Sequence, residues 1–566
     1  MTENELAQLL GADGELVTEQ LDRWSRERGS NTFLFYGETG TEMSFADVAQ
    51  RTDAISGNLQ RLGIGKGDHV SVFCTNSLLA ALSMFGIWKA GAVYCPINFS
   101  YTGRLLEYQL NDTSPRLVIT EPDLLPALNE VASLLEDAPK VSVCADPINP
   151  NDADVPSIDG TYGSIAWSEL TSDCSPADVK LDPSDAANLI YTSGTTGPAK
   201  GVLLPHRWMA QYTFLSRKLC NENDVIYNDL PMYHVGGAVF NICRAAWLGC
   251  EVAIWNRFSP DSFWSRIAER KATTAVLLDV MIPWLMKAPA GADDRRNTLN
   301  KVHMQPLPLD HAVFADRFGI DHVTAGFGQT ETGNGLIVMI RQSGEGEGTP
   351  SDLYFGPSHA EIAQTMQEIN VPVISPEQAE RKGIMGVPSP FVEVSVRRED
   401  DSLCDTGEIG HLTLRPKLPN IFLQTYWRKP EATADALRNL WFHTGDAAFL
   451  GEDGFYYYND RLGDRIRVRG ENLSSFQVED LLNRHPGVRM SAVVGVPSEE
   501  GNEDDIAAFV IATSPDALSE DIVRAYATEN MPKYMRPRFI RIVDDLPRTP
   551  TNKVEKYKLR KLIVEG

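Results

Sequence analysis

Segments with helical and strand-like spacing alternate along the first part of the chain. Residues 44–63 have the apolar spacing of a helix behind a capping Ser44, and residues 69–74 form a short strand-like run. A second helical stretch follows at 77–91, and a second strand-like run at 92–98. This alternation predicts an α/β architecture.

Further strand-like runs, separated by helical patterns or by Pro and Gly turns, predict one or more large mixed sheets. They are residues 117–120, 140–145, 188–193, 224–230, 251–255 and 273–279. Near residue 460 the pattern changes to a hairpin signal, then a helix, two strands, another helix and a basic tail. We therefore expect a large N-terminal domain, 1–460, with several subdomains, and a small mobile α+β domain, 461–566.

The charge and composition of the chain restrict which binding partners and which cellular compartment are expected. The chain of 566 residues has 52 Lys and Arg against 77 Asp and Glu, a formal charge of -25 that disfavours binding to nucleic acid or anionic lipid. No segment has the length and apolarity of a membrane span or a signal peptide, so we expect a cytoplasmic protein. The eight scattered cysteines lack a CxxC pair, which favours buried reduced thiols.

The loop "YTSGTTGPAKG", residues 191–201, follows an apolar strand-like run. Its glycines let backbone N–H groups approach a phosphate, its hydroxyls add donors, and its lysine adds positive charge. The loop lacks the Gly-Lys-Ser/Thr ending of a P-loop, so an ordinary P-loop NTPase is not supported. The residues expected to hold a polyphosphate are Thr192, Ser193, Gly194, Thr195, Thr196, Gly197 and Lys200.

Six further segments follow this loop in a fixed order. They are "PMYHVGG" (231–237), "FGQTE" (327–331), "MGVPSPFVEV" (385–394), "WFHTGD" (441–446), "DRLGDRIRVRGEN" (460–472) and "PRTPTNKVEK" (547–556). With them the chain resembles the acyl-adenylate-forming enzymes, which include acyl-CoA synthetases, firefly luciferase and the adenylation domains of peptide synthetases. The resemblance covers nearly the whole chain.

This resemblance implies a two-step ligase that uses ATP, Mg²⁺ and coenzyme A. In the first step a carboxylate attacks the α-phosphate of ATP to give acyl-AMP and pyrophosphate. In the second step a thiol displaces AMP. Because two anions react in the first step, its main requirement is electrostatic stabilisation and alignment.

Site residues in the nucleotide pocket follow from the resemblance. It implies that Thr330 contacts the α-phosphate, that Glu331 helps to hold Mg²⁺, and that Asp446 accepts hydrogen bonds from the ribose hydroxyls, assisted by Arg461. Phe327 stands where these enzymes commonly place an aromatic ring against adenine, and a core position is its alternative. Two neighbours in the same motif complete this set: Gly328 and Gln329.

The resemblance also implies that two residues lie beside the reacting groups. Lys553 matches the family lysine that reaches the carboxylate and the bridging phosphate oxygens when the small domain closes. His234 matches the residue that edges the acyl pocket, where packing and gating are favoured over proton transfer. The resemblance also implies a hinge of the small domain at Gly463, with Asp464 beside it.

The acceptor is expected to be CoA. Arg465, Arg467 and Arg469 alternate at strand spacing, which predicts three guanidinium groups on one face, either for a polyanionic acceptor or as a solvated sheet edge. Gly470 resembles the position that approaches the pantetheine arm. A separate carrier protein is the alternative acceptor, and a non-catalytic nucleotide-binding protein or a luciferase-like oxidase are further alternatives. A homodimer is compatible with the sequence.

The sequence restricts the identity of the carboxylic acid substrate only in part. The stretch "MYHVGGAVF" contains no Asp for an α-ammonium group, so a non-amino carboxylic acid is expected. Residues 303–307, "HMQPL", replace the usual "GGAPL" turn, and with the 460–472 segment they resemble the carnitine and crotonobetaine CoA ligase branch. Asp279 either caps a helix or meets a polar group of the acid. Residues 341–383 are either a tolerated insertion or a surface excursion near a site.

Overall fold

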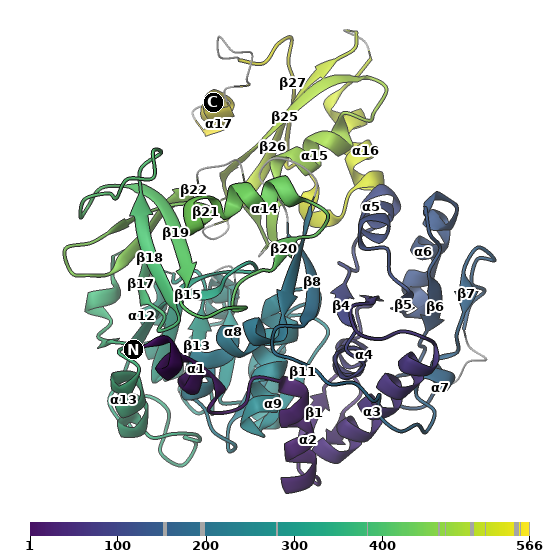
Figure 1. The fold of residues 1–566 in the computed structure, drawn as a ribbon. Coiled ribbons are helices and arrows are strands. Elements are labelled where there is room, and N and C mark those ends of the chain that lie inside the picture. The colour runs from purple at the N-terminus through teal and green to yellow at the C-terminus, as the bar shows by residue number, and fades with distance from the viewer. Residues whose placement is uncertain are drawn as a thin grey trace.

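The chain forms two large sheets with a smaller C-terminal unit above them (Figure 1). The computed structural model describes the whole chain except residues 151–154, 193–198, 279–280, 309, 382, 462–464, 470, 499–502, 515–516, 548–553, 555 and 565–566. Within the described residues, every helix is too short or too polar to cross a membrane. The predicted α/β class, with a small α+β unit at the C-terminal end, is confirmed.

The first sheet, on the right in Figure 1, has a parallel centre and an antiparallel edge. In spatial order its strands are β20 (Thr425–Tyr426), β9 (Lys200–Pro205), β8 (Ala186–Thr192), β4 (Val93–Pro96), β3 (His69–Phe73), β5 (Leu117–Thr120), β6 (Lys140–Val143) and β7 (Gly163–Ser164). The strands predicted at 69–74, 92–98, 117–120 and 140–145 are therefore present. The antiparallel pair β8–β9 brackets the glycine- and hydroxyl-rich loop.

The second sheet changes from parallel to antiparallel pairing at β14. In spatial order its strands are β18 (Val392–Arg397), β19 (Gly410–Pro416), β21 (Phe442–Leu450), β22 (Tyr456–Arg461), β17 (Ile384–Pro388), β15 (Gly333–Arg341), β14 (His322–Gln329), β13 (Lys301–Met304), β12 (Thr274–Leu277), β10 (Val225–Asn228), β11 (Glu251–Ile254), β1 (Thr32–Tyr36) and β2 (Thr41–Ser44), with β16 (Val373–Ile374) beside β15. Because β10, β12, β13 and β14 are parallel, their carboxyl ends meet at one edge of the sheet.

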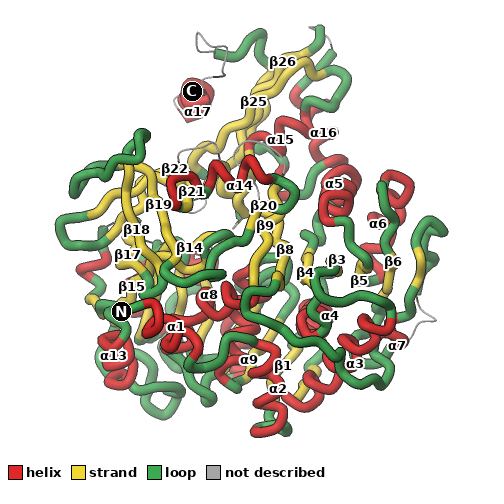
Figure 2. The backbone as a smooth tube through the Cα atoms, in the orientation of Figure 1, coloured by secondary structure: helices red, strands yellow, loops and turns green. Residues whose placement is uncertain are grey.

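Helices fill the space around and between the sheets (Figure 2). They are α1 (Glu3–Gly11), α2 (Val17–Glu27), α3 (Phe45–Arg61), α4 (Ser77–Lys89), α5 (Gly103–Thr113), α6 (Leu125–Val131), α7 (Trp167–Leu170), α8 (His206–Lys218), the π-helix η4 (Gly236–Cys243), α9 (Arg244–Leu248), α10 (Phe263–Arg270), α11 (Met281–Met286), α12 (His311–Phe318), α13 (His359–Glu368) and α14 (Pro430–Ala436). Ser44 caps α3 as predicted, because its hydroxyl accepts from the Asp47 N–H. Helix α4 is buried on all sides and packs in the core that both sheets share.

The C-terminal unit has cores of its own. The hairpin of β23 (Arg465–Val468) and β24 (Glu471–Ser474) packs on the sheet of β25 (Val488–Pro497), β26 (Asp504–Ala512) and β27 (Phe539–Ile542), which α15 (Ser475–Leu482), α16 (Glu520–Asn530) and α17 (Lys556–Val564) cover. Among the described residues, strands β23 to β27 pair only with one another. The boundary at residue 461 stays a prediction, since the adjoining residues 462–464 are not described.

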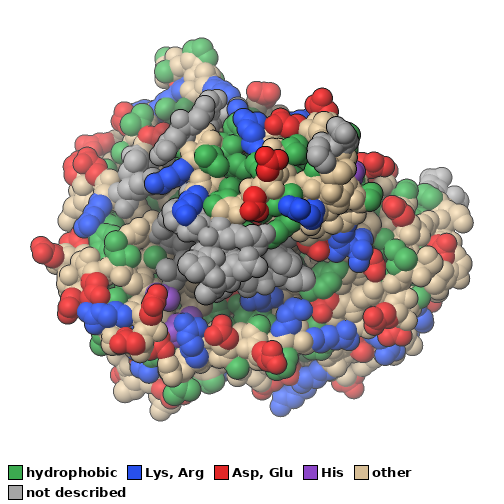
Figure 3. All heavy atoms as spheres, turned by 90° about the horizontal axis from the view of Figure 1, so that it is seen from above, with side chains coloured by type: hydrophobic (Ala, Val, Ile, Leu, Met, Phe, Trp, Pro, Cys, Tyr) green, Lys and Arg blue, Asp and Glu red, His purple; other side chains and the backbone are tan. Residues whose placement is uncertain are grey.

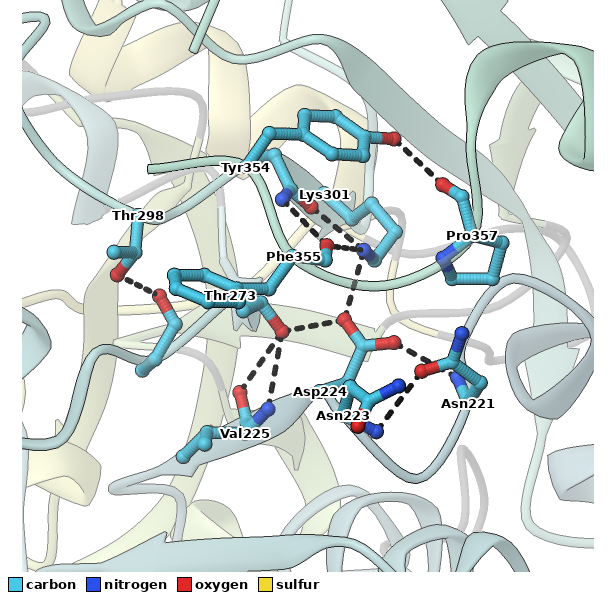
Figure 4. A network of polar contacts seen from close by, with 12 residues as sticks. Asn221, Asn223, Asp224, Val225, Thr273, Thr298, Lys301, Tyr354, Phe355 and Pro357 are labelled. Atoms are coloured by element: carbon cyan, nitrogen blue, oxygen red, sulfur yellow. Dashed lines mark hydrogen bonds and ion pairs between the residues drawn. The ribbon is translucent and has the colours of Figure 1, made fainter. Parts of the chain in front are cut away.

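The segment 341–383 is anchored to the body beside a buried ion pair of the body (Figure 4). Lys301 Nζ lies 2.8 Å from Asp224 Oδ1, and both side chains are almost fully buried. Lys301 and Asn300 also donate to the carbonyl oxygen of Phe355, at 3.3 and 2.9 Å. Helix α13 of this segment lies at the lower left of Figure 1, on the side remote from the C-terminal unit.

Candidate active site

A cavity of about 1260 Å³ lies where the strand ends of both sheets face the C-terminal hairpin. The predicted site residues that line it are Thr192, His234, Phe327, Gly328, Gln329, Thr330, Glu331, Asp446 and Arg469. Residues more than 250 positions apart in the chain therefore meet in one cavity, which is the convergence that the sequence motifs predict. Figure 3 looks down on the C-terminal unit and shows acidic and basic side chains interspersed over this face of the molecule, with hydrophobic patches between them.

Glu331 is held in place by two hydroxyl groups. Its Oε1 accepts hydrogen bonds from Tyr426 Oη at 3.0 Å and from Thr192 Oγ1 at 3.4 Å. Lys200 Nζ lies 4.8 Å from the centre of the Tyr426 ring. Strands β8, β9 and β20 position these partners, because all three are neighbours in the first sheet. The carboxylate is thus fixed beside Thr192, at the start of the predicted phosphate loop, where a hard cation bound to phosphate oxygens would need an oxygen ligand.

The metal-binding capacity of this site depends on Glu331 and on ligand oxygens. The described residues contain no cluster of three or more His, Cys, Asp and Glu side chains that would form a complete metal cage. Mg²⁺ commonly binds proteins through one or two carboxylates, with phosphate and water as its other ligands. One preoriented carboxylate beside the predicted polyphosphate loop therefore fits Mg²⁺ that would arrive with a nucleotide.

Asp446 projects from a bulge in β21. Strand β19 places only Leu412 between its partners, whereas β21 places Thr444, Gly445 and Asp446 in the same interval. Gly445 has φ 78°, which a residue with a side chain adopts only with strain, and this turns Asp446 toward the cavity. Gln329 Nε2 donates to Asp446 Oδ2 at 2.7 Å and to the Thr444 carbonyl at 3.1 Å.

The remaining residues predicted for the nucleotide pocket stand at or just beyond the ends of two strands, β14 and β22. Phe327 lies near the end of β14 and is largely buried against the core, with an edge on the cavity. Arg461 is the backbone partner of Asp446 in the β21–β22 pair, so it stands beside the bulge. Thr330 and Glu331 follow β14 in the turn to β15, because Gln329 pairs with Gly333.

His234 and Tyr233 contact the C-terminal hairpin. His234 Nε2 lies 2.8 Å from Glu471 Oε2, and Tyr233 Oη donates to Glu471 Oε1 at 2.6 Å. Burial by itself lowers the pKa of His234, but the charge and hydrogen bond of Glu471 outweigh burial and raise it. The same contacts lower the pKa of Glu471 in spite of its burial. His234 precedes η4, a π-helix of a kind that is frequent at functional sites.

The predicted row of three arginines on one strand face is wrong for Arg469. Strand β23 ends at Val468, and Arg469 has φ 52° in the turn of the hairpin, so it leaves the alternation of the strand. It nevertheless lines the cavity, as does Arg467, whose Nη2 lies 3.4 Å from the Gln305 carbonyl oxygen. The tight connection between β23 and β24 requires this left-handed turn.

Several predicted residues lie outside the described part of the chain. They are Lys553, the loop residues Ser193, Gly194, Thr195, Thr196 and Gly197, the hinge residues Gly463 and Asp464, Gly470, and Asp279. Their roles stay predictions. Of the described residues between 342 and 381, none lines the cavity, so the segment 341–383 is placed away from the site apart from Gly383.

One wall of the cavity is polar. His303 Nδ1 lies 3.0 Å from Thr324 Oγ1, and its Nε2 lies 3.0 Å from Gln305 Oε1. Burial lowers the pKa of His303 to about 4, so the ring is neutral at physiological pH. This wall is the "HMQPL" segment, which the sequence marks as a departure from the usual turn.

Sequence reasoning missed three residues of the site: Tyr426, Tyr233 and Glu471. Tyr426 holds Glu331, and the other two join the hairpin to His234. Glu471 follows Gly470 in "RGEN", and Tyr233 precedes His234 in "PMYH", so both stand next to residues that the motifs single out. Tyr426 carries no local signal of this kind, because its partner is 95 positions away.

Comparisons with known proteins agree with this geometry. A family model described as AMP-binding enzyme matches residues 21–427, and a model described as AMP-binding enzyme C-terminal domain matches residues 477–553. The crotonobetaine/carnitine–CoA ligase of Citrobacter koseri is 26% identical over 97% of this chain and 99% of its own length. The enzyme of that name from Salmonella arizonae is 26% identical over 91% of this chain and 93% of its own.

Solved structures share the fold. The o-succinylbenzoate CoA synthetase of Bacillus subtilis superposes with a TM-score of 0.75 at 20% identity, covering 96% of this chain and 98% of that chain. An amide bond synthetase from Marinactinospora thermotolerans gives a TM-score of 0.74 at 21% identity, covering 97% and 99%. With the family models and the cavity together, the expected recognition is confirmed: the chain belongs to the AMP-binding enzyme family and is an adenylate-forming enzyme of the acyl-CoA ligase type.

Proposed function

We propose that the enzyme uses Mg²⁺ and ATP to convert a carboxylic acid that lacks an α-ammonium group into acyl-AMP, and then transfers the acyl group to coenzyme A. The observation that carries this proposal is the meeting of Thr192, Glu331, Asp446 and the hairpin residue Glu471 around one cavity. The relatives named as CoA ligases, which align along nearly the full chain, support CoA as the acceptor.

In the proposed complex, the nucleotide lies in the part of the cavity that Phe327, Gly328 and Asp446 line. Phe327 stacks against adenine, Gly328 leaves room for the nucleotide, and Asp446 accepts hydrogen bonds from the ribose hydroxyls beside Arg461. Gln329 orients Asp446, since it already occupies one carboxylate oxygen. Thr330 contacts the α-phosphate. The loop from Thr192 to Lys200 holds the β- and γ-phosphates with hydroxyls, backbone N–H groups and the lysine charge.

The first step joins a carboxylate oxygen of the acid to the α-phosphorus and breaks the bond from that phosphorus to pyrophosphate. Mg²⁺, held through Glu331, would neutralise the charge that shifts between the phosphates. Glu331 stays oriented for this task through its hydrogen bonds with Tyr426 and Thr192. Lys553 is assigned to the reacting oxygens, where its ammonium group reduces the repulsion between two anions.

In the second step the CoA thiol attacks the acyl carbon, the bond to AMP breaks, and the thiol proton is released to solvent. We assign the hairpin β23–β24 to this step, because Glu471, Arg467 and Arg469 already face the cavity. Gly470 would let the pantetheine arm approach the backbone. His234 edges the acyl pocket and gates it through its contact with Glu471.

The two-unit division, 1–460 and 461–566, belongs to this proposal, with a hinge near Gly463. A cytoplasmic location is proposed with it, since ATP and CoA are abundant there. A separate carrier protein as acceptor is the competing version of the second step. It shares every feature of the first step, so only the acceptor test separates the two.

The decisive measurement is exchange of labelled pyrophosphate into ATP with a broad panel of carboxylic acids, followed by AMP release with CoA or with a phosphopantetheinylated carrier protein. We expect exchange with one class of acid, and AMP release that CoA accelerates. Absence of exchange with every acid would overturn the ligase proposal. Acceleration by the carrier protein alone would transfer the second step to that acceptor.

A further inference from the structure

Helix α5 contacts both strands that carry predicted phosphate-binding residues. Tyr108 Oη donates a hydrogen bond to the Ala199 carbonyl at 2.8 Å, and Ala199 directly precedes β9. On the neighbouring strand β8, Tyr191 Oη donates to Asp112 Oδ2 at 2.8 Å and accepts from Thr113 Oγ1 at 3.0 Å. One helix therefore holds β8 and β9 at the ends that flank the predicted phosphate loop.

The side chains on this face of α5 repeat at helical spacing. Leu105, Tyr108 and Asp112 are separated by three and four positions, which places them on one face of the helix. Leu106 and Leu110, on an adjoining face, are buried with α6 in the core of the first sheet. Helix α5 is thus fixed to the sheet along one face, and a second face carries its contacts with β8 and β9.

The first turn of the same helix touches the C-terminal unit. Leu105 packs against the apolar core of that unit, which the hairpin β23–β24 helps to form. Just before the helix, Asn98 Nδ2 donates to Tyr534 Oη of the unit at 3.2 Å. Figure 1 shows α5 beside the C-terminal unit. From Leu105 to Asp112 the helix rises by about 10 Å, so one short element joins the unit to β8.

The strand ends that α5 holds carry groups assigned to the nucleotide phosphates. Thr192 is the last residue of β8 and pairs with Lys200, the first residue of β9. Thr192 Oγ1 also donates to Glu331 Oε1 at 3.4 Å, so a shift of β8 would move this hydroxyl relative to the proposed Mg²⁺ ligand. Tyr108 and Asp112 do not line the cavity, and they can act on a nucleotide only through these strands.

The links between α5 and the strands are partly shielded from water. Burial raises the pKa values of Tyr108 and Tyr191, so both phenols are neutral and remain hydrogen-bond donors. Trp427 forms a second bridge, because its Nε1 donates to the Asp112 carbonyl at 2.9 Å and its backbone N–H donates to the Gly201 carbonyl at 2.7 Å. Breaking such a bond leaves a partly buried polar atom unpaired, which favours the linked arrangement.

We propose that Tyr108 and Asp112 are positioning residues for the first step, because they fix Thr192 and Lys200 relative to each other around the β- and γ-phosphates. Since Leu105 of the same helix packs on the C-terminal unit, the placement of that unit influences how firmly α5 holds the two strands. This inference rests on the proposed ligase function, as it concerns residues assigned there to the phosphates. It adds a path by which the C-terminal unit affects the ATP site.

The first test measures pyrophosphate exchange at varied ATP, and thiolysis of supplied acyl-AMP, for the wild type and for Tyr108→Phe, which removes only the phenol hydroxyl. We expect KM for ATP to rise by roughly 10-fold with little change in kcat, because a hydrogen bond that positions the strand of Lys200 is lost. Thiolysis should stay close to wild type, since pyrophosphate has already left.

Tyr162→Phe is the matched control. Tyr162 donates to the Leu128 carbonyl at 2.8 Å in the core of the same sheet, and it does not line the cavity. This variant should lower the urea concentration of unfolding without changing KM for ATP, which separates positioning from stability. A Tyr108→Phe enzyme with wild-type KM for ATP would overturn the inference.

Variants of Asp112 decide the question even where Tyr108→Phe does not fold. Asp112→Asn keeps an acceptor oxygen for Tyr191 and should retain a KM for ATP within a few-fold of wild type, whereas Asp112→Ala should raise it by roughly 10-fold. Equal KM values in these two variants would contradict the role of the hydrogen bond. If the wild type exchanges no pyrophosphate with any acid, the ligase proposal itself fails.

The link to the C-terminal unit is tested by combining Leu105→Ala with Tyr108→Phe. We expect Leu105→Ala alone to raise KM for ATP by roughly 3-fold, and to add little once the Tyr108 hydroxyl is absent, because both changes act through one helix. If the two effects simply multiply in the double variant, α5 does not transmit the position of the C-terminal unit to the strands.

Discussion

Glu471 Oε2 lies 2.8 Å from His234 Nε2, and this ion pair joins the C-terminal hairpin to the loop that follows β10. Tyr233 donates to the second oxygen of the same carboxylate, and Asn98 Nδ2 donates to Tyr534 Oη at 3.2 Å nearby. The contacts hold the hairpin against the cavity. They therefore stabilise the arrangement in which the hairpin, and with it the proposed acceptor site, faces the acyl pocket.

Glu471→Gln should slow the second step more than the first. The variant keeps the shape of the side chain but removes the charge that pairs with His234. The arrangement in which the hairpin faces the cavity is therefore less populated. We expect a decrease of roughly 10-fold or more in CoA-dependent turnover of supplied acyl-AMP, with pyrophosphate exchange close to wild type. Stopped-flow thiolysis and pyrophosphate exchange on one preparation check this. Equal losses in both reactions would refute the assignment.

The same ion pair gives thiolysis a pH dependence. The pKa of His234 is raised above its ordinary 6.5, so the contact is complete below that value and is lost as pH rises through the raised pKa. The pKa of Glu471 is lowered below 4.5, so the contact is lost on the acid side only when pH falls through that lower value. The window in which the contact is intact lies between the lowered pKa of Glu471 and the raised pKa of His234. Neighbouring phenol groups stay neutral in this pH window, because burial raises the pKa values of Tyr101, Tyr233 and Tyr534.

We therefore expect single-turnover thiolysis of acyl-AMP to decline on the alkaline side of the window, after correction for ionisation of the CoA thiol. His234→Gln should flatten this decline, since a glutamine does not titrate. An unchanged profile in His234→Gln would show that another group controls it.

Lys553→Ala should nearly abolish acyl-AMP formation from ATP, because the ammonium group is assigned to the reacting anions of the first step. Thiolysis of supplied acyl-AMP should remain largely intact, since the second step does not require that charge. Lys561→Ala is the control, as Lys561 is an exposed lysine of α17 in the same tail. Its rates should match those of the wild type in both reactions. A comparable loss of both steps in Lys553→Ala would contradict the role of the lysine.

Local patterns were sufficient for most of the fold. The helix behind Ser44 and the strand of residues 69–74 were predicted because periodicity and capping depend on near neighbours. Arg469 was misplaced because strand alternation was extended across a turn, where φ is 52°. The turn itself was not visible in the apolar pattern.

The sequence predicted the residues of the candidate site that belong to motifs, but not the contacts that these residues make with distant parts of the chain. Asp446 was found from "TGD", but the bulge that projects it arises from pairing with β19, which lies over 30 positions earlier. Tyr426 and Glu331 meet across 95 positions, and His234 and Glu471 across 237. Such contacts follow from tertiary packing, and a single sequence without alignment does not record them.

Tyr426→Phe should weaken the use of Mg²⁺ without disturbing the fold. The change removes the hydrogen bond to Glu331 Oε1 and keeps the ring over Lys200. Loss of such a supporting partner typically lowers metal affinity by about 10-fold or more, so the Mg²⁺ concentration for half-maximal pyrophosphate exchange should rise by about that factor. Tyr456→Phe is the control, because Tyr456 donates to the Val394 carbonyl outside the cavity. An unaltered Mg²⁺ dependence in Tyr426→Phe would contradict the assignment of Glu331 as a ligand of the metal.

Lys301→Met should destabilise the large domain through the ion pair in Figure 4. The change leaves the Asp224 carboxylate buried without its cation, and the partners that remain to it among the described residues are Thr273 and the Asn221 N–H. Removing one partner of a buried pair commonly costs about 3–5 kcal/mol of unfolding free energy, whereas the exposed pair Arg296–Asp352 should contribute less than about 1 kcal/mol.

Urea unfolding of Lys301→Met, of the control Arg296→Met, and of the double variant Lys301→Met with Asp224→Asn measures these costs. We expect the double variant to be more stable than Lys301→Met alone, because it no longer buries an unpaired charge. The segment 341–383 should detach first, since Lys301 and Asn300 hold it through the Phe355 carbonyl, and protease cleavage within 341–383 should report this. If Lys301→Met unfolds at the same urea concentration as Arg296→Met, the buried ion pair does not stabilise the fold as expected.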